Sequence, residues 1–205
     1  MMLANMRNDW GVGGAILAPL FRRSRDRRLA ERGDNYVEIN PFLCPMTDLL
    51  PEDGKALHVV HMVREPGDWA TSITNFKAST RFRDVIDHVP FAKPYPSPRP
   101  EGWSAMPEIE RALWRWQWCN SNIAKIAPRC EAYSLVRYEH LFSSDHATVR
   151  HTVDTVSRTL GMARPLTLDP ADLDRRANPS QGDQARPAQD VIDRICGPQA
   201  ARYGY

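Results

Sequence analysis

The residues with the clearest chemical potential lie in the segment HVVHMVREPGDWATSITNF, which spans 58–76. Arg64 follows an apolar run in this segment, and Ser72 stands eight positions further along. A guanidinium can bind two phosphate oxygens as a fork, and a serine hydroxyl can donate a further hydrogen bond. The pair therefore predicts an anion site. The alternative is that Arg64 pairs with Glu65 or Asp68 and that Ser72 is an ordinary helix residue.

The residues around this pair predict a strand, a tight turn and a helix. Residues 56–63 read ALHVVHMV, a nearly continuous apolar run that is typical of a buried strand in a parallel sheet. Trp69, Ile73 and Phe76 follow at spacings of four and three, as in an amphipathic helix. Open α/β sheets bind ligands at the carboxyl ends of their strands, and the N-terminus of the next helix favours an anion there. The predicted elements would thus place Arg64 at a phosphate site.

Strand and helix patterns alternate along the rest of the chain. Two more short β-prone runs are predicted at 36–39 and 133–136. Three further helices are predicted from apolar spacing and from proline or glycine at their ends: 107–127, 149–160 and a short one at 191–196. Segments 88–103 and 163–188 are rich in proline and are expected to be loops. The alternation indicates an α/β fold with a parallel central sheet flanked by helices.

Residues 1–34 differ from the remainder and are predicted to be a poorly defined basic segment ahead of an α/β domain at 35–205. The basic cluster at 22–28 favours a solvated helix face or a frayed end, with a functional basic patch as the alternative. The whole chain has 27 Lys+Arg against 25 Asp+Glu, a net charge of +2, which provides no general attraction to nucleic acid. No apolar run approaches the roughly 20 residues of a membrane span.

Neither the cysteines nor the histidines form a metal-binding pattern. The four cysteines have no CxxC spacing, so we expect reduced, buried, small hydrophobic residues in a cytoplasmic protein. His58 and His61 are three apart on the predicted strand and must point to opposite faces, which favours structural histidines over shared ligands. We therefore expect no metal site.

Residues 63–72, VREPGDWATS, resemble the 3′-phosphate-binding motif of sulfotransferases that use phosphoadenosine phosphosulfate (PAPS). That motif is a hydrophobic strand followed by R-[DNE]-P-x-[DE]-x-x-x-S. Other segments resemble landmarks of the bacterial members in the same order: YVEINP at 36–41, Trp116 with Asn120 and Ile123 as W-x-x-x-N-x-x-I, VRYEHL at 136–141, and the ending at 195–205. The resemblance covers nearly everything after residue 34.

The resemblance implies a P-loop-like sulfotransferase fold and in-line transfer of a sulfuryl group from PAPS, the co-substrate, to a hydroxyl or amine of a small-molecule acceptor. Arg64 and Ser72 would bind the 3′-phosphate, and Tyr138 would contact the adenine ring or else pack at the strand end. Glu38 would be the base that accepts the acceptor's proton. Its alternative is a salt bridge with an arginine of the basic cluster. Arg175 and Arg176 would lie in a loop that closes over the nucleotide.

The family's first strand and 5′-phosphosulfate loop, roughly G-x-x-[RK]-[ST]-G-[ST]-[ST], have no counterpart here. The glycines at 11–14 lack the Lys/Arg-Ser/Thr-Gly core. We expect an N-terminally incomplete fold, either a fragment or a member without the loop, that retains nucleotide affinity but has little catalysis, because the loop neutralises the leaving group. The alternatives are a non-catalytic sulfotransferase-like binding or scaffold protein and an unrelated phosphate-binding α/β domain that takes ATP.

Overall fold

The centre of the fold is a pair of parallel strands. The structure is a computed structural model that describes residues 14–32, 37–39, 41–50, 56–76, 93–168 and 182–205. Strands β1 (His58–Val63) and β2 (Ala132–Arg137) pair in register from His58↔Ala132 to Val63↔Arg137. The prediction of a mixed α/β fold with a parallel sheet is confirmed for this part of the chain.

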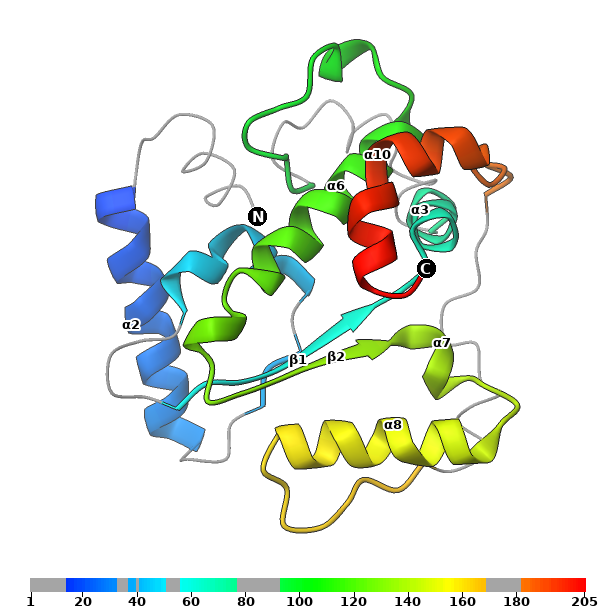
Figure 1. Ribbon diagram of the computed structural model, residues 1–205. Helices are drawn as coiled ribbons and strands as arrows, with labels where there is room; N and C mark the ends of the chain where they lie inside the picture. Colours follow the sequence, from blue (N-terminus) through cyan, green and yellow to red (C-terminus); the bar gives the residue numbers. More distant parts are fainter. Residues whose placement is uncertain (1–13, 33–36, 40, 51–55, 77–92, 169–181) are drawn as a thin grey trace.

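Helices cover both faces of the strand pair (Figure 1). Because side chains alternate across a strand, His61 points to Asn120 on α6, whereas Ser134 on the other face bonds Thr159 on α8. The helical elements are, in chain order, α2 (Gly14–Arg32), η1 (Pro41–Leu49), α3 (Pro66–Thr74), η2 (Trp103–Ala105), α6 (Glu108–Ala124), η3 (Ala127–Arg129), α7 (Tyr138–Leu141), α8 (His146–Thr159) and α10 (Gln189–Arg202).

The strand, turn and helix predicted around Arg64 are confirmed. Pro66 occupies the first turn of α3, where its missing N–H has no intrahelical partner to lose. The carboxylate of Glu65 caps the helix by accepting a hydrogen bond from the N–H of Asp68 at 2.6 Å. Helix α3 therefore starts immediately after β1 and its turn.

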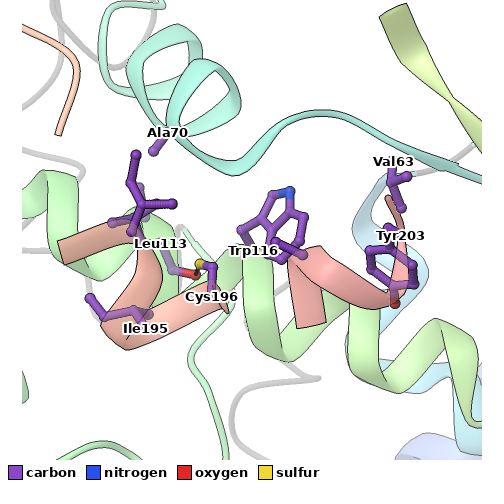
Figure 2. Close-up of a cluster of buried hydrophobic side chains, with 10 residues drawn as sticks. Val63, Ala70, Leu113, Trp116, Ile195, Cys196 and Tyr203 are labelled. Carbon is purple, nitrogen blue, oxygen red and sulfur yellow. Dashed lines mark hydrogen bonds between the residues drawn. The ribbon is translucent and has the colours of Figure 1, made fainter. Parts of the chain in front are cut away.

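The main hydrophobic core lies between β1, α3, α6 and α10 (Figure 2). Leu113 and Trp116 of α6 are 0% and 1% exposed. The buried members of this core are Val63, Ala70, Ala112, Leu113, Trp116, Ile192, Ile195, Cys196, Ala200 and Tyr203. The Arg64 turn thus lies next to this core, between Val63 and Ala70, which both belong to it.

The prediction that the last helix ends before Gly197 and Pro198 is wrong, since α10 continues to Arg202. A proline inside a helix removes one main-chain hydrogen bond and crowds the preceding turn. Burial beyond the proline outweighs this cost: Tyr203 is a core residue, and its hydroxyl donates to the main-chain oxygen of Asn120 at 3.1 Å.

The strand predicted at 36–39 is also wrong for its described part, because 37–39 have no regular structure. Residues 36 and 40 lie outside the described residues. Val37 and Ile39 are 55% and 94% exposed, so no apolar face is buried that would favour a strand. Glu38 lies between them and pairs with α2, where Arg25 donates to its carboxylate at 2.6 Å.

A cluster of charges fixes the start of α6. The carboxylate of Glu108 accepts hydrogen bonds from Lys93 at 2.6 Å, Arg111 at 2.9 Å and Arg115 at 2.8 Å. Partial burial opposes ionisation of Glu108, but the nearby cations Arg115 and Lys93 outweigh it and lower its pKa from 4.5 to about 2.

This cluster predicts a pH-dependent contribution to stability. A carboxyl group whose pKa is lower in the folded state stabilises the protein above its unfolded pKa and loses that effect as the pH falls toward the folded value. We expect Glu108→Gln to lower the free energy of unfolding by on the order of 3 kcal/mol at pH 6, and more than half of this difference to vanish by pH 3. Urea unfolding of both proteins at the two pH values measures it, and a difference independent of pH would contradict it.

Candidate functional site

Arg64 and Tyr138 meet at the carboxyl edge of the strand pair. Arg64 directly follows β1, and Tyr138 directly follows β2 as the first residue of α7. Because the strands are parallel and in register, their carboxyl ends lie side by side. The guanidinium of Arg64 lies over the ring of Tyr138, 5.1 Å from its centroid. The structure therefore brings together two of the three residues that the sequence assigns to nucleotide binding.

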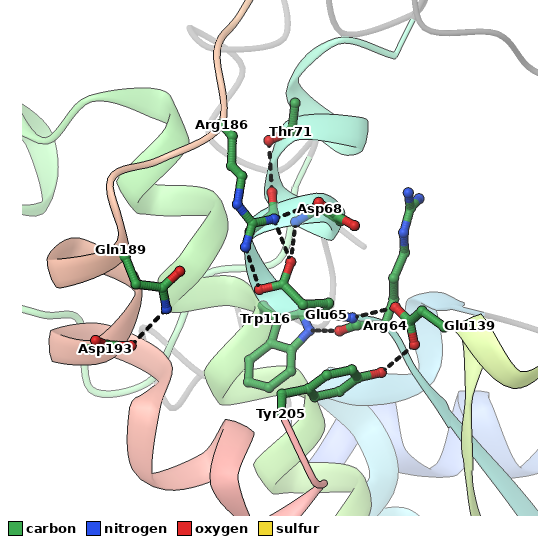
Figure 3. A network of polar contacts seen from close by, with 11 residues as sticks. Arg64, Glu65, Asp68, Thr71, Trp116, Glu139, Arg186, Gln189, Asp193 and Tyr205 are labelled. Atoms are coloured by element: carbon green, nitrogen blue, oxygen red, sulfur yellow. Dashed lines mark hydrogen bonds and ion pairs between the residues drawn. The ribbon is translucent and has the colours of Figure 1, made fainter.

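Three elements fix the main chain at Arg64 (Figure 3). The indole N–H of Trp116 donates to the main-chain oxygen of Arg64 at 2.9 Å. The N–H of Glu65 donates to Glu139 at 2.8 Å, and the hydroxyl of Tyr205 donates to the other oxygen of Glu139 at 2.6 Å. Burial and the neighbouring Glu139 raise the pKa of Tyr205, so its hydroxyl remains a donor. The main chain of the turn is thus hydrogen-bonded to α6 and α7, and Tyr205 supports it through Glu139.

The guanidinium of Arg64, by contrast, projects away from this network (Figure 3). Among the described residues, no carboxylate forms an ion pair with it. Its partner is the face of Tyr138, and a cation over an aromatic ring keeps its N–H groups available for an anion. A guanidinium whose main chain is hydrogen-bonded, and to which the described residues offer no carboxylate, is suited to bind a phosphate.

The acidic residues next to Arg64 pair with a different arginine. Arg186, from the segment that leads into α10, donates to both oxygens of Glu65 at 2.7 and 2.9 Å and to Asp68 at 2.5 Å. Partial burial acts to raise the pKa of Glu65, but the hydrogen bonds from Arg186 and from the N–H groups of Asp68 and Gly67 lower it overall. The local charges of the turn are therefore neutralised without Arg64.

Sequence reasoning did not identify Arg186. It also expected the N-terminus of α3 to be available to an anion, although this helix start is already engaged. Arg186 lies 121 residues from Glu65, and the arginines proposed for the nucleotide loop, at 175–176, fall outside the described residues. The N–H of Asp68 already bonds Glu65. A side chain at Gly67 would meet the Arg186 guanidinium, because a Cβ there would lie 2.6 Å from its central carbon.

The third nucleotide-binding candidate, Ser72, is half-buried in the second turn of α3. Two hydroxyls of the same helix are used internally: Thr71 donates to the oxygen of Gly67 at 2.7 Å and Thr74 to that of Ala70 at 2.8 Å. The described residues provide no such partner for Ser72, and no hydrogen bond joins it to Arg64. Its role in anion binding stays a prediction.

The predicted base, Glu38, lies against α2. Its carboxylate is 13% exposed, accepts a hydrogen bond from Arg25, and lies 3.6 Å from a guanidinium nitrogen of Arg28. This confirms the salt bridge that the sequence offers as an alternative. None of the described contacts joins Glu38 to Arg64 or Tyr138, so a role as base would require the carboxylate to leave its arginine partners.

His61 is a buried structural residue, as predicted. Its Nδ1 lies 2.6 Å from the hydroxyl of Tyr133 and its Nε2 lies 2.9 Å from the side-chain oxygen of Asn120. Burial lowers the pKa of His61, and the bond to Asn120 opposes this only in part, so the ring is neutral at pH 7.

In the part of the chain that the structure describes, no group of three or more His, Cys, Asp and Glu side chains could hold a metal ion. No described helix is long and apolar enough to cross a membrane.

Loss of the ion pairs of Arg186 is expected to destabilise the start of α3 rather than the whole fold. We expect Arg186→Ala to lower the free energy of unfolding by only about 1 kcal/mol, because the guanidinium is 43% exposed and water screens its charge. Amide exchange at 68–74 should become about fivefold faster, since the helix start loses its tether. Arg194→Ala is the matched control, because Arg194 forms an exposed pair with Glu110 away from the turn. Equal exchange in both variants would contradict the prediction.

Comparisons with known proteins return no match: no protein-family model, no curated protein and no solved structure matches this chain.

Proposed function

We propose that this chain is a sulfotransferase-like protein whose strand edge at Arg64 binds the 3′-phosphate of PAPS. One observation carries the proposal: Arg64 has a hydrogen-bonded main chain and a guanidinium without a described carboxylate partner, at the carboxyl edge of a parallel strand pair. Ligands of open α/β sheets bind at that edge. The resemblance of residues 63–72 to the family motif supplies the identity of the nucleotide.

The charge distribution supports an anionic ligand. Arg186 neutralises Glu65 and Asp68, so these carboxylates do not compete with a phosphate for Arg64. A phosphate that binds Arg64 would form charge-assisted hydrogen bonds, which are about twice as strong as neutral ones. Ser72 is the candidate for a further hydrogen bond to the same phosphate.

The aromatic residues beside Arg64 support a nucleotide over a simple anion. The rings of Tyr138 and Phe142 lie 4.7 Å apart, centroid to centroid, and Phe142 is one of the exposed large hydrophobic residues. Purine bases stack on such rings, with a contribution of about 1–3 kcal/mol per base. We assign the adenine ring to this pair, which extends the sequence expectation for Tyr138.

In the proposed reaction PAPS supplies the sulfuryl group, which passes to a hydroxyl or amine of a small acceptor. The roles of this chain are to hold the nucleotide through Arg64, Ser72 and Tyr138 and to accept the acceptor's proton. Glu38 is the candidate for the second role, once it is released from Arg25. Since no phosphosulfate loop is recognisable in the sequence, we expect nucleotide binding to be strong relative to turnover.

A non-catalytic binding role is the second candidate. The observation in its favour is the pairing of Glu38 with Arg25 and Arg28, which engages the proposed base. Both candidates share the nucleotide site, so turnover of PAPS with an acceptor separates them, whereas binding alone does not.

Thermal unfolding with three nucleotides tests the shared site. Adenosine 3′,5′-bisphosphate, the product of sulfuryl transfer, should raise the melting temperature, whereas adenosine 5′-monophosphate, which lacks the 3′-phosphate, should not. A larger shift with ATP would favour a kinase-like phosphate-binding domain instead. No shift with any of the three would overturn the proposal.

A further inference from the structure

Two cysteines far apart in sequence meet side by side. The sulfur atoms of Cys44 in η1 and Cys119 in α6 lie 2.8 Å apart, although 75 residues separate the two positions. A disulfide bond is about 2.05 Å long, so bond formation requires the sulfurs to approach by less than 1 Å. The other cysteines are placed differently: Cys130 donates to the main-chain oxygen of Ile126, and Cys196 to that of Leu113. The contact is therefore specific to one pair.

The two elements that carry this pair are already joined. The hydroxyl of Thr47 in η1 lies 3.2 Å from the main-chain oxygen of Asn122 in α6 and 3.3 Å from that of Cys44. This places η1 and α6 against each other within one helical turn of Cys119. A bond between the sulfurs would fix an existing contact and would not need the two elements to rearrange.

A surface cleft borders one member of the pair, Cys44. Its volume is about 340 Å³, and Cys44 forms part of its lining together with Trp118, Lys125 and Arg129. Cys44 itself is only 3% exposed, so an oxidant must approach it from the cleft that it lines. A peroxide-sized molecule fits such a cleft, whereas another protein's disulfide does not reach the sulfur easily.

We propose that Cys44 and Cys119 are a redox-modification site that forms a reversible disulfide with hydrogen peroxide as oxidant. The Cys44 sulfur attacks one peroxide oxygen, which gives a sulfenic acid and releases water. The Cys119 sulfur then attacks the Cys44 sulfur, and the hydroxyl leaves as a second water with the thiol proton. Two thiols are oxidised to one disulfide, and one peroxide is reduced to two waters.

The order of these steps follows from the surroundings of each thiol. The hydrogen bond to Cys44 and burial raise the pKa of Cys119, so this thiol stays protonated at neutral pH and is a weak nucleophile. Cys44 lines the cleft and meets the oxidant first. Reaction should accelerate as the pH rises, because the thiolate is the reacting form.

The bond would act on the helix that supports the Arg64 turn. Cys119 precedes Asn120, which bonds His61, and lies one turn after Trp116, which bonds the main chain of Arg64. A disulfide would tie this part of α6 to η1 and restrict its motion. The inference does not depend on what Arg64 binds, because thiol chemistry is measured without a nucleotide.

Peroxide treatment of the reduced, folded full chain tests the proposal. We expect the free thiol count to fall from four to two, the mass to fall by that of two hydrogen atoms, and a peptide map without reductant to link Cys44 to Cys119. Dithiothreitol should reverse all three changes. Closing a loop of this length should raise the melting temperature by on the order of 10 °C.

Two single variants provide the matched comparison. Cys130→Ser should still form the bond, whereas Cys119→Ser should not and should leave Cys44 as a sulfenic acid that a dimedone-type reagent captures. Four unreacted thiols in the folded wild-type chain, at peroxide concentrations that oxidise the same chain in urea, would overturn the proposal. A disulfide that involves Cys130 or Cys196 would overturn it as well. Both of these outcomes are measured on the wild-type protein and do not depend on a variant.

Discussion

Arg64→Ala is expected to weaken binding of adenosine 3′,5′-bisphosphate about 10- to 100-fold, which corresponds to about 1.5–3 kcal/mol for a charge-assisted contact. The loss should be large because the described residues offer the guanidinium no carboxylate, so a bound phosphate would be its main ionic partner. Arg64→Lys should be intermediate, since a lysine keeps the charge but cannot bind two oxygens as a fork. Calorimetric titration measures all three affinities.

The same variant should leave the fold almost unchanged. The main-chain bonds at this position come from Trp116, Glu65 and their partners and do not involve the guanidinium. The control is Arg99→Ala, because Arg99 also lies over a tyrosine ring, that of Tyr95, at 4.7 Å but outside the site. If Arg64→Ala binds the nucleotide as tightly as Arg99→Ala, then Arg64 does not belong to a phosphate site.

The local part of the fold was predictable because local sequence decides it. The apolar run before Arg64 favours a strand in a parallel sheet, and Pro66 can begin a helix but not continue a strand. The burial is less complete than that pattern predicts, since Met62 of β1 is 46% exposed. The contact between Arg64 and Tyr138 follows in the same way, because the residues that follow two neighbouring parallel strands share one edge of the sheet.

The errors lie where distant partners decide the structure. Helix α10 passes Pro198 because Tyr203 beyond it reaches α6 in the core, and no residue near the proline indicates this. The alternating pattern around Glu38 resembles a strand, but Val37 and Ile39 are exposed, and the charge between them pairs with α2. In both cases tertiary contacts outweighed local propensity: burial of Tyr203 in the first, and the ion pair of Glu38 in the second.

Arg186 was the residue of the site that sequence could least reveal. The sequence contains only an indirect indication of this residue, namely the two carboxylates, Glu65 and Asp68, in the turn after β1. The arginine that neutralises both lies 118–121 residues further along the chain. The neighbouring sequence suggests only Arg64 as a partner for Glu65 and Asp68. This pairing bears on the proposed phosphate site, because among the described residues it leaves Arg64 without a carboxylate partner.

The site and the core depend on one another through Trp116, and Trp116→Ala is expected to have the largest effect on stability. Removing a buried tryptophan costs about 3–5 kcal/mol, a large share of the 5–15 kcal/mol that is typical of a whole domain. Trp116 is 1% exposed and packs edge-on against Tyr203, with ring centroids 6.0 Å apart. Chemical unfolding measures the loss, and a change below about 1 kcal/mol would contradict the core assignment.

Trp116→Phe separates packing from the hydrogen bond that holds the Arg64 turn. The phenyl ring keeps most of the buried area but leaves the main-chain oxygen of Arg64 without its donor, which should cost about 1–3 kcal/mol and also weaken nucleotide binding. Trp114→Phe is the matched control on the same helix, because the buried indole N–H of Trp114 has no acceptor among the described residues. Removing that unpaired N–H should cost little, so equal losses in the two variants would show that the Trp116 indole does not position Arg64.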